Sequence, residues 1–252
     1  MRIVVIGGTG LIGSRVVSLL TEHGHEAVPA SPSSGVNTVT GEGVKEVLEG
    51  ADVVVDVSNS PSFADDDDVM AFFRAATTNL TEAAKGAGVG HFVALSVIGS
   101  DRLPESGYLR AKVAQEELIK GSGLPYSIVR ATQFFEFVGA IADGGTEGNV
   151  VKLPDAGIQP IAASEVSGAV AKVAAGSPLG GMTEIGGPEV FTMESWVREA
   201  LTFRNDPREV TVDPEARYFG EKPGPKGLLP DEGAQLGQIK FADWLPANPP
   251  RK

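Results

Sequence analysis

The chain opens with a short apolar segment and a glycine-rich turn, Arg2 to Ser14, RIVVIGGTGLIGS. Residues 3–6 predict a buried strand, the glycines at 7, 8, 10 and 13 predict a tight turn, and an amphipathic helix follows. Glycines permit positive φ, let the backbone approach a pyrophosphate closely, and let helix and strand pack tightly. The helix then directs its N-terminal N–H groups at the phosphates. A strand, glycine turn and helix in this order predict dinucleotide binding.

The predicted cofactor contacts at this turn are Gly7, Gly8, Thr9, Gly10, Leu11, Ile12, Gly13 and Arg15. Further along, apolar segments and helical stripes alternate as far as residue 145. Strands are predicted at residues 26–28, 36–40, 51–57, 90–96 and 126–130, and helices at 43–48, 69–87 and 108–120. This alternation predicts an α/β protein with a Rossmann-type doubly wound parallel sheet.

The pattern changes after residue 145, so we expect a Rossmann core at 1–145 and a smaller C-terminal substrate or lid subdomain at 146–252. The subdomain is expected to pack on the sheet's carboxyl edge, so that both parts form a single structural unit. Its predicted strands are 149–153 and 183–185, and its helices are 164–174, capped by Ser164, and 192–203, capped near its start. Phe241, Trp244 and Leu245 are expected to dock the C-terminus, and Pro246 to Lys252 to fray.

The charge balance limits the partners. With 33 acidic and 21 basic residues the net charge is −12, which argues against direct nucleic-acid binding. No apolar run reaches membrane-spanning length and Met1 leads directly into a strand, so we expect no signal peptide and a cytoplasmic protein. Cysteine is absent, and the three histidines form no cluster with ligand spacing, so no metal site is expected.

The loop after the second strand bears on the choice of cofactor. Residues 30–35 contain neither the Asp or Glu that would bind the 2′-hydroxyl of NAD nor a basic residue. Ser31, Ser33 and Ser34, together with Arg15, are groups that suit a 2′-phosphate, which favours NADP(H) over NAD(H). A simple polar loop remains the alternative. Ser58 and Asn59, at the end of the strand 51–57, are further predicted cofactor contacts.

Ser96 ends a predicted strand, and Tyr108 and Lys112, four residues apart, share one face of the next helix. With Gly7, Gly10 and Gly13, this pattern resembles the short-chain dehydrogenase/reductase superfamily. The glycine spacing and the segment 91–137 are similar to its atypical, NmrA-like branch. The resemblance implies that Tyr108 is the acid/base, that Lys112 binds the nicotinamide ribose, and that Ser96, or else Ser100, polarises the substrate. A nearby ammonium should also lower the pKa of the tyrosine.

The segment after the strand 126–130 is expected to pass the nicotinamide and the substrate. By this resemblance Ala131, Thr132 and Gln133 are predicted cofactor contacts. Phe134, Phe137 and Gln159 are predicted to line an apolar substrate pocket, with Phe135, Trp196 and Tyr218 as weaker candidates; packing in the core is the alternative for the aromatic residues.

Two functions remain open at this point. The first is an NAD(P)H-dependent oxidoreductase that transfers hydride to a small carbonyl or quinone-like substrate. The second is a non-catalytic NADP(H)-sensing regulatory protein of the NmrA type, because the fold alone does not guarantee turnover. A nucleotide-sugar epimerase is disfavoured by the small C-terminal part. A homodimer is left open as the oligomeric state.

Overall fold

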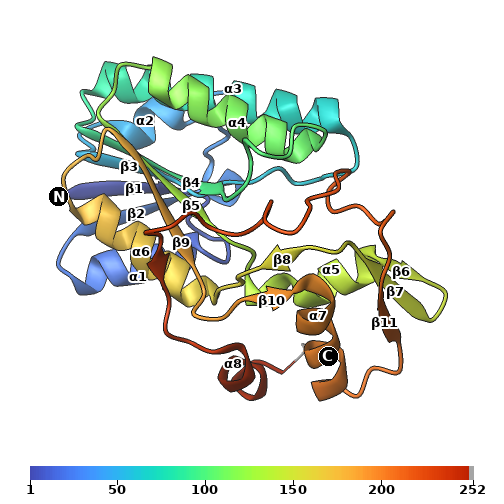
Figure 1. Ribbon diagram of the computed structural model, residues 1–252. Helices are drawn as coiled ribbons and strands as arrows, with labels where there is room; N and C mark the ends of the chain where they lie inside the picture. The colour runs from blue at the N-terminus through green and yellow to red at the C-terminus, as the bar shows by residue number, and fades with distance from the viewer. Residues whose placement is uncertain (250–252) are drawn as a thin grey trace. The chain divides into compact units, whose positions relative to one another are not determined.

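Seven strands form one parallel sheet in the order β12-β9-β5-β4-β3-β1-β2 in the computed structural model, which describes residues 1–249 (Figure 1). The strands are β1 (Arg2–Ile6), β2 (Glu26–Ala30), β3 (Val53–Asp56), β4 (His91–Val97), β5 (Tyr126–Ala131), β9 (Gly181–Gly186) and β12 (Gln235–Leu236). Every residue of β3 is buried, as expected of a strand that is covered on both faces. The predicted Rossmann-type fold is confirmed.

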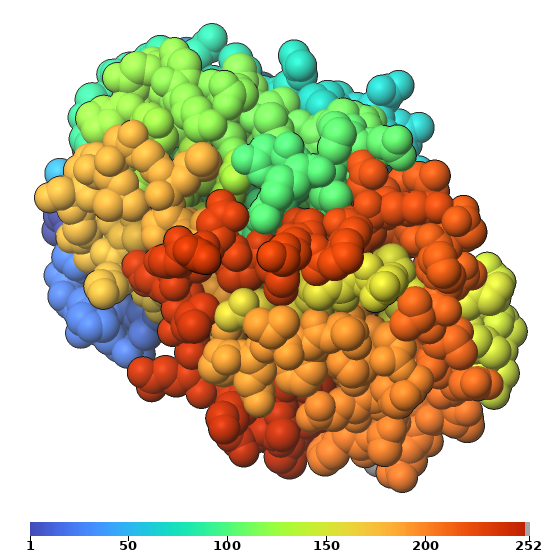
Figure 2. Space-filling view, in the orientation of Figure 1, coloured from blue at the N-terminus to red at the C-terminus, as the bar shows by residue number. Residues whose placement is uncertain are grey.

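Helices cover both faces of this sheet. Helices α1 (Gly13–Glu22) and α6 (Ala163–Ala175) lie on one face, and α2 (Val44–Leu48), α3 (Asp66–Ala87) and α4 (Gly107–Gly121) lie on the other (Figure 1). The space-filling view shows the adjoining outer surfaces of α3 and α4, in teal and green (Figure 2). Between β2 and α2 the chain forms a short 3-10 helix, η1 (Pro32–Ser34).

The chain divides into two compact units that are interleaved along the sequence. The first unit comprises Met1–Ser96, Gly107–Arg130 and Val166–Thr183, and the second comprises Val97–Ser106, Ala131–Glu165 and Glu184–Lys252. A division at residue 145 was expected, whereas the chain leaves the first unit at three places. Two of these crossings fall near the carboxyl ends of β4 and β5 and the third falls within β9, where the sequence shows no change of composition.

The second unit is built around an aromatic cluster. Its elements are η2 (Phe135–Phe137), α5 (Val138–Gly144), β6 (Thr146–Glu147), β7 (Val150–Leu153), β8 (Gly157–Ile158), β10 (Phe191–Thr192), α7 (Met193–Phe203), β11 (Glu209–Val212) and α8 (Phe241–Ala247). The ring of Phe241 lies 4.9 Å from Phe135 and 5.6 Å from Trp196, and it stacks on Trp244. These contacts confirm that Phe241, Trp244 and Leu245, all buried, dock the C-terminal helix.

Three local predictions are wrong. Residues 36–40 form turns instead of a strand, because the side-chain oxygen of Asn37 accepts hydrogen bonds from the N–H groups of Val39 and Thr40. Ser164 lies inside α6, whose first N–H group, that of Ala163, donates to Glu136 instead. Pro246, expected to fray, lies within α8, and residues 250–252 are outside the described part of the chain.

Two helix starts agree with their capping residues. The Thr192 hydroxyl caps α7 by accepting from the N–H of Ser195. Asp65 caps α3, whose first turn carries three further aspartates, and such an acidic first turn stabilises the helix through its dipole. Within residues 1–249 no group of three or more His, Cys, Asp or Glu is arranged to hold a metal ion, and no helix there is long and apolar enough to cross a membrane.

His91, at the start of β4, gives a prediction for stability against pH. Its Nε2 lies 2.8 Å from the Ser127 hydroxyl, and burial lowers the pKa of the imidazole below 6.5 despite a hydrogen bond with the Gly176 backbone. The folded state therefore favours neutral histidine, so this contribution is complete above pH 6.5 and is lost as the pH falls towards the folded pKa. We expect urea unfolding at pH 7.5 and 5.5 to show a larger loss of stability in the wild type than in His91→Gln, and equal losses would contradict the assignment.

Candidate functional site

The turn after β1 has no room for a side chain at Gly8 or Gly13. A Cβ on Gly13 would lie 2.2 Å from the Gly7 carbonyl oxygen, and one on Gly8 would lie 2.7 Å from the Val5 carbonyl oxygen. Gly7 has φ of 77°, which disfavours any residue with a Cβ. The N–H of Gly10 donates to the carbonyl of Gly7 at 2.9 Å, which closes the turn. The geometry is therefore the one that brings a backbone against a pyrophosphate.

The first turn of α1 offers its N–H groups without competition from its own side chains. Its N-cap residue, Ile12, provides no side-chain hydrogen bond, and the first turn carries no acidic residue. Thr9, Gly10 and Leu11 are exposed just before it. At the N-terminus of α3, in contrast, the side chain of Asp65 accepts hydrogen bonds from the N–H groups of Asp67 and Asp68. The N-terminus of α1 therefore fits the phosphates of a dinucleotide, because N–H groups and the helix dipole favour an anion there.

The loop after β2 contains three linked serines. The hydroxyls of Ser31 and Ser33 are 2.8 Å apart, and the Ser34 hydroxyl donates to the Ser31 carbonyl while accepting from its N–H. Ser31 is buried, and Ser33 and Ser34 are exposed. Arg15 is exposed on α1. The loop carries no carboxylate that would repel a 2′-phosphate, so it suits NADP, and the preference itself stays a prediction.

The loop after β3 contacts α4. The side chain of Asn59, an exposed residue, hydrogen-bonds to Tyr108. The Ser58 hydroxyl donates to Asp56 at 2.6 Å, so it reaches a cofactor only as an acceptor. Phe63, from the same loop, packs edge-on against the Tyr108 ring with centroids 5.1 Å apart. The structure thus brings together the predicted cofactor residue Asn59 and the predicted acid Tyr108.

The pKa of Tyr108 differs from the prediction. Burial raises it to about 12, and the hydrogen bond from Asn59 offsets only part of that rise. Lys112 was expected to lower this pKa, and that expectation is wrong because its ammonium is directed elsewhere. The Lys112 Nζ donates to the Leu95 carbonyl at 2.9 Å and to the Gln115 side chain, and it lies 4.6 Å from the Phe73 ring centroid. At neutral pH Tyr108 is therefore a protonated phenol.

Lys112 is itself unusual because it is 3% exposed. Burial lowers its pKa to about 8, and the carboxylates of Asp56 and Glu116 act in the opposite direction. A lysine with this pKa is mostly charged at pH 7 and loses its charge as the pH rises through about 8. Strongly shifted groups of this kind are frequent at functional sites.

The hydroxyl of Ser96 is committed to a buried ion pair. It donates to Glu116 at 2.7 Å, and Glu116 also accepts from Nε and Nη2 of Arg130, at 2.9 and 2.7 Å. All three side chains are at least nine-tenths buried. The Ser96 proton is therefore unavailable to a substrate carbonyl, contrary to the role predicted for it.

The remaining predicted residues belong to the second unit. The Thr132 hydroxyl donates to the Gln159 carbonyl, and the Gln159 amide donates to Gly187, each at 2.7 Å. The rings of Phe134 and Phe137 stack with centroids 5.3 Å apart. Ala131 is buried at the end of β5, Trp196 is part of the aromatic core, and Tyr218 packs against Phe219.

Among the buried polar groups of this unit that have no hydrogen-bond partner in the described part of the chain, two follow sheet strands. These are the amide of Gln133, through both its oxygen and its nitrogen, and the hydroxyl of Ser100, which is 1% exposed. Each lies just past the carboxyl end of a sheet strand, β5 and β4 respectively. Because unsatisfied buried polar groups are costly, such groups are well suited to bind a ligand that supplies the missing partners.

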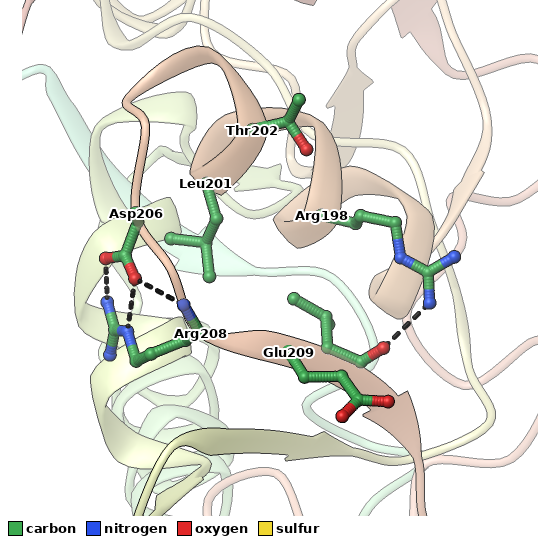
Figure 3. A pocket seen from close by; sticks show the side chains of 7 residues that line it. Arg198, Leu201, Thr202, Asp206, Arg208 and Glu209 are labelled. Carbon is green, nitrogen blue, oxygen red and sulfur yellow. Dashed lines mark hydrogen bonds and ion pairs between the residues drawn. The ribbon is translucent and has the colours of Figure 1, made fainter.

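A cavity of about 360 Å³ lies between α7 and β11 of the second unit (Figure 3). It is lined by Arg198, Leu201, Thr202, Asp206, Arg208, Glu209 and Val210, and none of the predicted site residues is among them. Its arginines are already bound: Arg208 to Asp206 and Asp143, and Arg198 to Glu194 and the Val210 carbonyl. Because both arginines bind groups of the protein itself, we interpret the cavity as a feature of the packing of the second unit and not as the candidate site.

The residues that sequence reasoning missed are Asp56, Gln115, Glu116 and Arg130. One signal was available, since Arg130 interrupts the apolar strand YSIVRA and a charge in a buried strand needs a partner. The partner, Glu116, stands beside Glu117 in the sequence, and nothing local separates the buried carboxylate from the exposed one. Only the fold reveals which of the two faces β5.

The parallel sheet, the close glycine turn and the open N-terminus of α1 define a dinucleotide-binding protein of the Rossmann class. Residues 7–174 match the family described as NAD(P)H-binding, and the chain belongs to that family. This match confirms the predicted relation to NAD(P)-binding proteins, and the NmrA-like branch of the short-chain dehydrogenase/reductase superfamily stays a prediction.

Several known proteins are similar to this chain. Photosystem II assembly factor Ycf39 of Cyanophora paradoxa is 27% identical over 150 residues, covering 54% of this chain and 46% of that protein. The chloroplastic divinyl chlorophyllide a 8-vinyl-reductase of Oryza sativa subsp. indica is 30% identical over 167 residues, covering 54% and 41%. The chain thus spans less than half the length of these relatives.

Solved structures of NADP-bound proteins share this fold. The structure of dTDP-4-dehydrorhamnose reductase from Bacillus anthracis str. Ames in complex with NADP superposes with a TM-score of 0.70 at 16% identity, covering 96% of this chain and 92% of that chain. At this level of identity the likeness concerns the fold alone.

Proposed function

We propose that this protein is an NADP(H)-dependent oxidoreductase that reduces a small carbonyl or quinone-like substrate. The observation that carries the proposal is the pairing of a dinucleotide cradle at the Gly7–Gly13 turn with a protonated phenol, Tyr108, and a buried lysine, Lys112, in the same unit. Membership of the NAD(P)H-binding family and the similarity to a vinyl-reductase support it.

NADPH, held at the Gly7–Gly13 turn, would supply the hydride for the carbonyl carbon, and the residues of the chain would handle the charge that develops on oxygen. Tyr108, with a pKa of about 12, donates its proton to that oxygen and regains one from solvent. Lys112 holds a ribose hydroxyl of the cofactor through the N–H that its protein acceptors do not use. Because the Ser96 proton is committed to Glu116, Ser96 does not donate to the substrate oxygen in this proposal.

The proposal is tested first by binding and then by turnover. NADPH and NADH are titrated against the purified protein by quenching of protein fluorescence, and NADPH oxidation is followed at 340 nm with a panel of ketones, aldehydes and quinones. We expect saturable NADPH binding and turnover of at least one class. Absence of binding of either cofactor would overturn the proposal.

Arg15 gives the prediction for cofactor choice. Replacement by Ala removes a cation close to the predicted 2′-phosphate, so NADPH affinity should fall about tenfold, as expected for the loss of a charge-assisted hydrogen bond, while NADH affinity stays unchanged. Arg74→Ala, at an exposed arginine on α3, is the matched control. An equal loss for both cofactors in Arg15→Ala would contradict the assignment of a 2′-phosphate site.

A second candidate function is NADP(H) sensing without turnover. It is favoured by the withdrawn position of Tyr108, whose ring lies against Phe63 and Phe73, and by similarity to a protein named as an assembly factor. It predicts tight binding of NADPH with no oxidation by any member of the substrate panel. The binding and turnover measurements above therefore separate the two functions.

A further inference from the structure

A chain of hydrogen bonds joins the ends of β3 and β4 through α4. Asp56, the last residue of β3, accepts through Oδ1 from the N–H and hydroxyl of Ser58, at 3.0 and 2.6 Å, and through Oδ2 from Nε2 of Gln115 at 3.0 Å. Oε1 of Gln115 accepts from Nζ of Lys112, and Nζ also donates to the Leu95 carbonyl at 2.9 Å. The chain thus begins at one predicted cofactor residue and ends at another.

The groups in this series of hydrogen bonds are buried, so each donor must face an acceptor. Asp56 and Gln115 are each 1% exposed, and Lys112 is 3% exposed. A carboxylate only accepts hydrogen bonds and an ammonium only donates them, so the Gln115 amide has one orientation that satisfies both ends. A reversed amide would leave a buried donor facing a cation and a buried acceptor facing an anion. Asp56 therefore fixes the Gln115 oxygen towards Lys112.

The surroundings of Lys112 limit the hydrogen bonds that its ammonium can donate to a ligand. Two of its three N–H bonds serve Gln115 and the Leu95 carbonyl, and the Phe73 ring lies 4.6 Å from Nζ. The charged groups around it are Asp56 from β3 and Glu116 from α4, and Glu116 is itself paired with Arg130 of β5. One N–H remains for a ligand, so the direction of that bond is set by the two acceptors that hold the other two.

We infer that Gln115, held by Asp56, is a positioning residue that fixes the Lys112 ammonium so that its remaining N–H bond meets a ribose hydroxyl of the cofactor. Naming that ligand rests on the proposed function, whereas the positioning itself is a property of the free protein. Gln115 touches neither the cofactor nor the substrate in this assignment. It acts through Lys112 alone.

The test measures Lys112 directly in the cofactor-free protein. Protein labelled with ¹⁵N-lysine is titrated by NMR, and Lys112→Met identifies the Nζ signal that titrates near pH 8. Gln115→Leu removes the acceptor while keeping similar bulk, so the pKa of Lys112 should fall by about 1, the loss expected for one charge-assisted hydrogen bond. The signal of Lys120, a partly exposed lysine on the same helix, should not move.

A second variant and a second readout complete the experiment. If Gln115→Leu does not fold, Gln115→Met supplies an unbranched side chain that also lacks the amide. An unchanged Lys112 pKa in a folded variant overturns the inference. In a binding titration below pH 7, where Lys112 stays charged in the wild type, we expect NADPH affinity to fall about tenfold in the variant, and unchanged affinity also counts against the inference. If NADPH binds to neither protein, the proposed function fails, and the lysine titration still decides the positioning role.

Discussion

Tyr108→Phe is expected to lower the turnover number by about 10² to 10⁴, the usual contribution of a positioned general acid. The change removes only the phenolic hydroxyl. The ring contacts with Phe63 and Phe73 are kept, and the exposed Asn59 exchanges its lost partner for water. NADPH affinity should therefore stay within about twofold of the wild type, which places the loss in the chemical step.

The pH dependence of the wild type gives a second measurement of the same assignment. With a pKa of about 12, Tyr108 stays protonated throughout the usual assay range, so it imposes no fall in the rate of reduction there. Lys112 has a pKa of about 8, and its cation is lost as the pH rises through that value. We expect kcat/KM for reduction to decrease above about pH 8.

Tyr126→Phe is the matched control, since Tyr126 is a partly buried tyrosine on β5 of the same unit. It should leave both NADPH binding and turnover nearly unchanged. Retention of full turnover by Tyr108→Phe with every substrate that the wild type reduces would remove Tyr108 from the mechanism. Loss of NADPH binding in Tyr108→Phe would instead place the tyrosine in the cofactor site.

Local patterns account for what could be predicted of the fold. The glycine turn could be predicted because its glycines are required by close contacts with nearby residues in the chain. A Cβ on Gly13, for example, would clash with the Gly7 carbonyl. The fully apolar β3 and the capped starts of α3 and α7 are similarly local. The strand predicted at 36–40 is wrong because the hydrogen bond that the Asn37 side chain accepts from the backbone favours a turn over a strand.

The sequence analysis named Ser96, Tyr108 and Lys112 but not the buried groups that their side chains contact. A Tyr-x-x-x-Lys pattern places two side chains on one helix face, yet the contacts of each side chain are made with groups outside the pattern. Lys112 turns to Gln115 and to the Leu95 carbonyl, and Ser96 turns to Glu116. Since these partners depend on how α4 lies on β3, β4 and β5, the pKa of Tyr108 and the commitment of Ser96 could not be foreseen from spacing.

Glu116→Ala is expected to destabilise the protein by about 3 to 5 kcal/mol, because it leaves a buried cation without its counter-ion. Arg130 is 5% exposed and donates two hydrogen bonds to Glu116, and Ser96 donates a third. All of these buried donors would lose their acceptor between α4 and the sheet. Urea unfolding followed by circular dichroism measures the loss as a lower midpoint with an unchanged slope.

The next residue along the helix supplies the control. Glu117 is exposed and pairs only with Lys120, so Glu117→Ala should change the stability by no more than about 0.5 kcal/mol. The double variant Glu116→Leu with Arg130→Met should recover most of the stability lost in Glu116→Ala, because it removes the cation together with the anion and fills the space with apolar groups. Equal effects of Glu116→Ala and Glu117→Ala would mean that the buried pair does not hold α4 on the sheet. Recovery in the double variant without recovery of NADPH turnover would instead show that the pair serves Lys112, whose charge Glu116 supports.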